Sequence, residues 1–84
     1  MTDYPHIITY AQLHDLLRAL GFNARATDDG PVYKHKASGA LLAFPTLPDA
    51  QFVMPHHLVG TRMTLDAFGI LEPHEFDARL RQAA

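Results

Sequence analysis

The sequence has no cysteine and no tryptophan among its 84 residues, and only 19% of its residues are charged. Without cysteine the chain can form neither disulfides nor thiolate metal sites, so nothing in it requires an oxidising compartment. It also lacks an apolar run of the roughly 20 residues that a membrane span needs. Residues 1–6 include the acidic Asp3 and have neither the basic nor the apolar region of a signal peptide. We therefore expect a cytoplasmic protein without a membrane segment.

What the chain does contain is enough apolar material to fold. Hydrophobic residues make up 48% of it, well above the composition typical of disordered proteins. Its length suits one domain with a modest core, so residues 1–84 are predicted to form a single unit. The formal net charge of −2 argues against strong, non-specific binding of nucleic acid, because such binding depends on Lys and Arg neutralising phosphates.

A helix is predicted over residues 9–20 because both of its ends carry clear signals. Thr9 can cap its start, and Gln12 occupies the reciprocal position of a capping box. Gly21 followed by Phe22 is typical of a left-handed helix stop. The apolar side chains between these signals recur at helical spacing and form one face: Leu13, Leu16, Leu17 and Leu20.

Three strands are predicted next, because the apolar pattern changes to a period of two. Residues 22–27 suit a half-buried strand, residues 32–36 a second and residues 40–44 a third. Turn-forming residues separate them, so two consecutive hairpins should form an antiparallel meander. Beyond Pro45 and Pro48, residues 51–54 are interpreted as an extended connector or a short extra strand.

Two further helices complete the predicted fold. One spans residues 55–68 and ends at Gly69-Ile70, and a short C-terminal helix begins at Pro73, a residue that suits the first helical position. The fold class is therefore α+β: helix, three-stranded antiparallel sheet, helix, then the short helix. The first two helices are expected to cover one face of the sheet.

The order of these elements and their short motifs resembles the HicA or YcfA-like family. The resemblance covers roughly residues 9–71 and is carried, in chain order, by Leu20-Gly21-Phe22, Gly30, Tyr33-Lys34-His35, Ser38-Gly39, Phe44-Pro45 and Gly69-Ile70. It implies a fold like that of the double-stranded-RNA-binding domain. In active members it also implies cleavage of messenger RNA, as the toxin of a toxin–antitoxin pair.

One departure from that family bears on activity. Active members share a Gly-Ser-His stretch entering the second strand, and its histidine serves the cleavage chemistry. Aligning on Gly30 places Pro31 and Val32 at the serine and histidine positions, whereas aligning on residues 33–35 places Asp29 and Gly30 there. Neither alignment supplies a histidine, and glycine, proline and valine cannot act as the general acid or base that RNA cleavage needs. The family position therefore predicts a catalytically silent member.

The sequence contains six histidines, which is an unusually high number for its length. Two of them, His35 and His56, are the remaining catalytic candidates. His56 and His57 are adjacent, so they point in different directions and do not chelate one ion together. We expect no metal site, and a polar role at the start of a helix for this pair. His35 would act with them only if the sheet brings them close; otherwise it is a half-exposed strand residue.

A short basic strip is the candidate nucleic-acid contact. Lys34 and Lys36 are predicted to share one face of the second strand, with Arg25 nearby on the first. The alternative interpretation is an ordinary solvated sheet face. Stacking partners for single-stranded bases are few, since only Tyr33 and Tyr10 qualify, so double-stranded RNA is the better RNA hypothesis.

Three functions remain open from the sequence. The favoured one is a catalytically silent HicA-like domain that binds RNA or an antitoxin-like protein partner. The second is a diverged ribonuclease that uses His35 or His56. The third is a protein interaction module, dimeric through an exposed sheet edge. No phosphate-binding loop, nucleophile elbow or paired-carboxylate motif is present, and no cofactor is expected.

Overall fold

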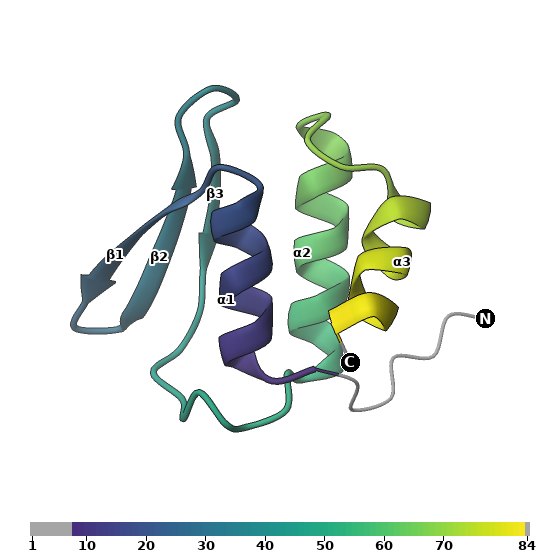
Figure 1. Ribbon diagram of the computed structural model, residues 1–84. Helices are drawn as coiled ribbons and strands as arrows, with labels where there is room; N and C mark the ends of the chain where they lie inside the picture. The colour runs from purple at the N-terminus through teal and green to yellow at the C-terminus, as the bar shows by residue number, and fades with distance from the viewer. Residues whose placement is uncertain (1–7, 84) are drawn as a thin grey trace.

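A computed structural model describes residues 8–83, so the expectation about a signal peptide at residues 1–6 lies outside the described residues. The fold is α+β with the predicted element order, and its three strands form an antiparallel meander in the order β1-β2-β3 (Figure 1). The elements are α1 (Tyr10–Ala19), β1 (Asn23–Thr27), β2 (Gly30–His35), β3 (Ala40–Ala43), α2 (Pro55–Ala67) and α3 (Pro73–Ala83).

Both predicted ends of α1 are confirmed. The Thr9 side chain accepts a hydrogen bond from the Gln12 amide at 3.3 Å, and the Gln12 side chain accepts one from the Thr9 amide at 2.8 Å. At the other end Gly21 has a φ of 97°, and the Phe22 amide donates to the Leu17 carbonyl at 3.0 Å. These bonds satisfy backbone groups that a helix end otherwise leaves free.

The ends of α2 and the start of α3 also follow the sequence signals. Gly69 has a φ of 67°, and the Ile70 amide donates to the Leu65 carbonyl at 2.9 Å, which repeats the stop at the end of α1. Pro73 is the first residue of α3 as predicted. Arg62 of α2 donates two hydrogen bonds to the Asp77 carboxylate at 3.2 and 3.3 Å, so α3 is tied to α2 by charge as well as by packing.

The sheet has one face against the helices and one face open. The inner face carries the buried residues Tyr33, Ala40 and Leu42. In Figure 1, α1 and α2 stand side by side on one side of the sheet, with α3 beyond them. Leu13 and Leu17 of α1 join this face in one core cluster with the α2 and α3 residues Leu58, Leu65, Phe76 and Leu80. The predicted placement of both helices on one face is therefore confirmed.

The outer face of the sheet is not covered by any described element. We use this name for the alternate strand residues that share it: Asn23, Arg25, Thr27, Val32, Lys34, Leu41 and Ala43. All of them except the partly buried Val32 are exposed. Antiparallel sheets commonly leave one face in water in this way.

Two predictions about the strands are wrong. The first strand was expected to be half-buried, but all five β1 residues are exposed, because Ala24 and Ala26 on the inner side are too short to reach α1. The second strand was expected to include Lys36, but β2 ends at His35. The Gly39 amide donates to the His35 carbonyl at 2.8 Å, so the chain already turns at Lys36.

The connector between β3 and α2 combines both interpretations offered for residues 51–54. It is extended, and Phe52 forms an isolated antiparallel bridge with Thr9, just before α1. The Tyr10 amide donates to the Gln51 carbonyl at 3.0 Å. A single bridge of this kind is too short for a strand but fixes the connector beside the start of α1.

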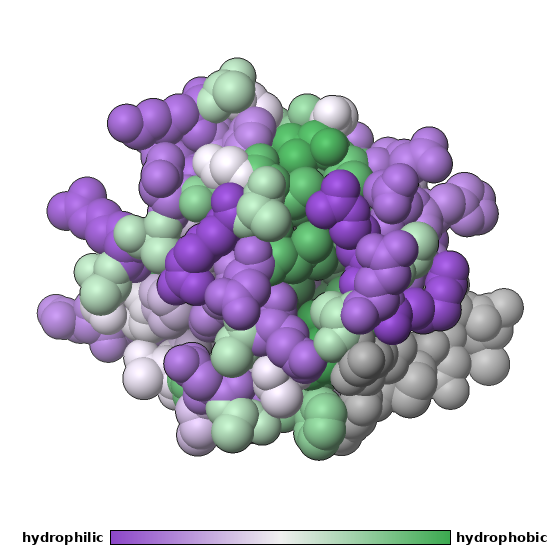
Figure 2. Space-filling view, in the orientation of Figure 1, coloured by the Kyte–Doolittle hydropathy of each residue, from purple (hydrophilic) through white to green (hydrophobic). Residues whose placement is uncertain are grey.

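The helices meet along a partly exposed apolar seam. Hydrophobic residues that pack on the core without being fully buried include Leu16, Leu20, Ile70 and Leu71. Figure 2 shows a hydrophobic strip between α1 and the other helices, with hydrophilic residues on both sides of it. None of the helices within residues 8–83 is long and apolar enough to cross a membrane.

Candidate functional site

The structure does not bring the two predicted catalytic histidines together. His35 packs on Phe22, which follows the end of α1, and their ring centroids are 5.0 Å apart. The Nδ1 atom of His35 is 2.8 Å from the Ser38 hydroxyl. His56 lies in the first turn of α2, next to the start of α1. Since α1 has 10 residues, about 15 Å of helix separates the two ends. His35 and His56 therefore do not share one catalytic centre.

His57 has the structural role at the helix start that was expected of this pair. The Tyr10 hydroxyl accepts a hydrogen bond from the Met54 amide at 3.3 Å and lies 2.6 Å from His57 Nδ1. Burial, and secondarily the charge of His56, lower the pKa of His57. Within the described chain, no three His, Asp or Glu side chains are grouped to hold a metal ion.

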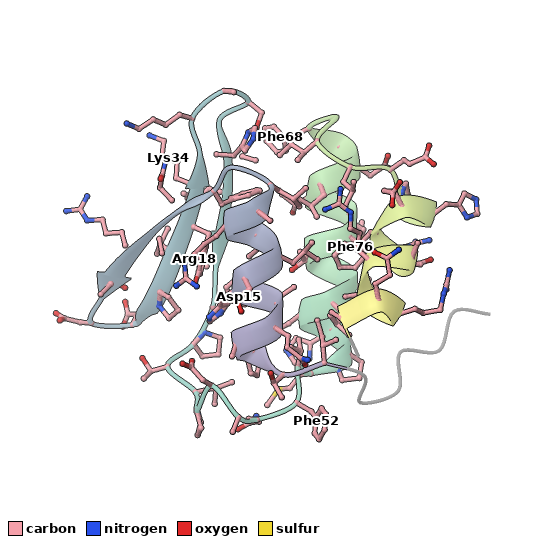
Figure 3. All side chains as sticks on the ribbon, in the orientation of Figure 1. Asp15, Arg18, Lys34, Phe52, Phe68 and Phe76 are labelled. Atoms are coloured by element: carbon pink, nitrogen blue, oxygen red, sulfur yellow. The ribbon has the colours of Figure 1, made fainter. Side chains whose placement is uncertain are left out.

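Two of the three predicted basic residues do share a face. Asn23 pairs with Lys34 and Arg25 pairs with Val32, so Arg25 and Lys34 are diagonal neighbours on the outer face. Lys34 extends away from the helices (Figure 3). Lys36 lies in the turn after β2 and is not part of this face. We call Arg25 and Lys34 the basic pair.

A groove between α1 and β1 is a feature that the sequence did not predict. Its volume is about 370 Å³, and it is open because the β1 alanines leave a gap beneath the helix. It is bounded by residues from four segments, α1, β1, β2 and the connector, and these include Ala11, His14, Arg18, Ala24, Ala26, Tyr33, Thr46 and Asp49. Concave sites of this size, with apolar walls and a few polar groups, are where small ligands bind.

Arg18 and Tyr33 supply polar groups to the groove. The guanidinium carbon of Arg18 lies 5.9 Å from the centroid of the Tyr33 ring, and its Nη2 is 3.5 Å from the Tyr33 hydroxyl. Arg18 Nη1 lies 3.3 Å from the Asp15 carboxylate, and Figure 3 shows both labelled residues on α1. Burial raises the pKa of Tyr33, opposed by the charge of Arg18, so its hydroxyl stays protonated near neutral pH.

His14 occupies the inner wall of the groove. Its ring lies against Tyr33 and Phe44, with centroids 4.9 and 5.5 Å away, and its Nε2 is buried without a hydrogen-bond partner. Burial lowers the pKa of His14, while the carboxylate of Asp49 acts in the opposite direction. A neutral imidazole in an aromatic setting is the result near pH 7.

The sequence did contain a signal for this site. Tyr10, His14 and Arg18 are spaced four residues apart and therefore form a polar stripe beside the leucine face of the same helix. What the sequence could not show is that the stripe faces β1. That depends on where the helix lies on the sheet.

The two half-buried histidines, His14 and His57, predict a pH dependence of stability. Their pKa values are lower in the folded chain than the ordinary value of about 6.5, so the unfolded chain binds more protons. The contribution of these two histidines to the free energy of unfolding is therefore complete above about pH 6.5, and it is lost as the pH falls below that value. Urea unfolding over a pH series should show this loss, and His14→Phe should reduce it.

His74→Gln, a change at an exposed residue of α3, serves as the control and should leave the pH profile unchanged. A wild-type stability that is constant between pH 7 and pH 5 would contradict the prediction.

Comparison with known proteins found no family model, no curated protein and no solved structure that matches the chain. A function has to be inferred from the residues themselves.

Proposed function

We propose that the chain is a small RNA-binding domain, without nuclease activity of its own, that contacts phosphates through the outer face of its sheet. One observation carries the proposal. Every charged side chain on this face of β1, β2 and β3 is positive, and no described element covers the face. The proposal agrees with what the resemblance to HicA-like proteins implies for a member without its catalytic histidine.

The composition of the outer face favours a duplex over a single strand. Among its seven residues none is aromatic, so it offers no platform on which unpaired bases could stack. The basic pair can contact phosphate oxygens, which duplex RNA presents regardless of sequence. Binding through only two cations should be weak and strongly dependent on salt.

The positions of the histidines support the absence of nuclease activity. General acid–base cleavage needs titrating groups within hydrogen-bond reach of the same phosphodiester. His35 bonds to Ser38, and His56 is at the far end of α1. We expect the purified protein to leave RNA intact. Cleavage that disappears in His35→Ala or His56→Ala would establish the diverged ribonuclease instead.

A protein partner is the second candidate, and one exposed side chain favours it. Leu41 lies on the outer face beside Lys34 and is 57% exposed. An acidic partner with an apolar residue, such as an antitoxin-like protein, would match this combination. Such a partner would bind the same face that we assign to RNA.

The salt dependence of binding tests the RNA assignment. We expect fluorescence anisotropy with labelled duplex RNA to show weak binding at low salt. The double variant Arg25→Gln, Lys34→Gln should flatten the slope of log affinity against log salt by roughly two units, about one per lost phosphate contact. The matched control is Arg79→Gln, Arg81→Gln on α3, which removes the same charge from another element.

An unchanged slope in the outer-face variant would refute the RNA assignment. Absence of binding by the wild type at low salt would refute it too, and would favour the protein partner. Equal losses in both double variants would show that net charge, and not the outer face, governs binding.

A further inference from the structure

The groove between α1 and β1 has the size of a site for one small ligand. Its volume of about 370 Å³ is near the lower end of the roughly 300–1,000 Å³ common for ligand pockets. The short side chains of Ala24 and Ala26 keep it open, while the β1 backbone forms a rigid wall opposite α1. A ligand here must be about as large as a nucleoside.

The inner surface of the groove suits a flat ring. His14 and Tyr33 lie next to each other with an angle of 36° between their rings, and both line the groove. Tyr33 is only 1% exposed, so the half-buried His14 ring, packed on Tyr33, is the one on which a ligand can stack. Stacking on aromatic side chains is a general way for proteins to hold nucleobases. Pro31 and Pro45 add rigid apolar surface at the sides.

The charged groups of the groove limit which flat-ring ligands it can bind. The Asp49 carboxylate forms no hydrogen bond or ion pair within the described residues, so it is free to accept donors. Arg18 pairs with the exposed Asp15, and its hydrogen bond to the Tyr33 hydroxyl is long, at 3.5 Å. Exchanging these contacts for another partner therefore costs little. The ligand must therefore present donors to a carboxylate and acceptors to a guanidinium from the same flat ring.

Guanine meets this requirement best among the common bases. Its N1–H and N2 amino group are donors for a carboxylate, and O6 and N7 are the acceptors that arginine binds in a bidentate manner. Adenine has an amino group in place of O6 and offers no such acceptor pair. We infer that the groove binds one guanine base, from a free nucleoside or nucleotide or from an unpaired position in RNA.

Guanosine, which has no phosphate, is the probe that separates this site from the outer face. Titration into isotope-labelled protein should shift the amide resonances of Ala24 and Ala26 and the side-chain Nε resonance of Arg18. Adenosine should bind at least about tenfold more weakly, since the bidentate contact with arginine is lost. Lys34→Gln on the outer face should leave guanosine binding unchanged, so the two proposals can fail separately.

The decisive variant is Asp49→Asn, which keeps the shape of the exposed side chain and removes its charge. It should weaken guanosine binding by about tenfold, because an amide cannot accept both guanine donors. Asp66→Asn, at an exposed position in the last turn of α2, is the matched control and should have no effect. Equal guanosine affinity in wild type and Asp49→Asn would overturn the inference. So would the absence of shifts in the groove, or equal binding of adenosine.

A short single-stranded RNA with one guanine, compared with its adenine counterpart, identifies the source of the base. Tighter binding of the guanine strand than of guanosine would assign the groove to RNA. Equal affinity would assign it to a free nucleoside or nucleotide. A strand that binds equally well with adenine in that position would contradict the guanine preference.

Discussion

Replacing Gly30 with alanine should destabilise the domain by about 3 kcal/mol or more. Gly30 has a φ of 125°, which L-residues rarely adopt. A Cβ at this position would also meet the backbone of the segment after β3, including Pro45 at 2.8 Å. A backbone segment cannot rotate aside as a flexible side chain can. For a chain of 84 residues the total stability is only about 4–13 kcal/mol, so this single methyl group should remove much of it.

Urea unfolding followed by circular dichroism measures the loss as a shift in midpoint. Gly39→Ala is the matched control, because Gly39 also has a positive φ, 82°, but nothing lies within 4 Å of its added Cβ. The control should cost only about 1–2 kcal/mol for its backbone conformation. If the two variants lose the same stability, the close approach to the backbone after β3 is not responsible.

Leu17→Ala should destabilise the domain by about 2–5 kcal/mol. The Leu17 side chain has no exposed surface and packs in the core between α1 and the sheet, so its removal leaves a cavity that the surrounding side chains fill only in part. Leu41→Ala removes the same atoms from the outer face, where the side chain is 57% exposed, and should cost no more than about 0.5 kcal/mol.

The contrast between these two leucines is measured by the same urea unfolding experiment. A loss below about half a kcal/mol in Leu17→Ala would remove this residue from the core. A large loss in Leu41→Ala would mean that the outer face is covered, against the arrangement seen in the sheet.

The parts of the fold that sequence predicted are those decided by neighbouring residues. The cap at Thr9 and the stop at Gly21 involve partners within five positions along the chain, so their signals are local. The side-chain alternation of a strand is local too, and it placed Arg25 and Lys34 on one face. Lys36 was misplaced because the bond between the Gly39 amide and the His35 carbonyl ends the strand before it.

What sequence could not predict depends on how the elements pack. The alternation in β1 suggested a buried side, but burial requires an element opposite, and α1 does not reach Ala24 and Ala26. The same gap creates the groove, so the exposed strand and the unpredicted site have one cause. His14 was missed for this reason, because its importance comes from facing that gap.

The bridge between Thr9 and Phe52 has a consequence for how the domain opens. The first amides of α1, those of Tyr10 and Ala11, donate to Gln51 and Asp49 at 3.0 and 3.1 Å. In most helices such amides face water and exchange their protons with solvent quickly. Here they can exchange only when the connector detaches. The start of α1 and residues 49–52 should therefore open as one cooperative unit, and a protease should cut the tips of the hairpins before this connector.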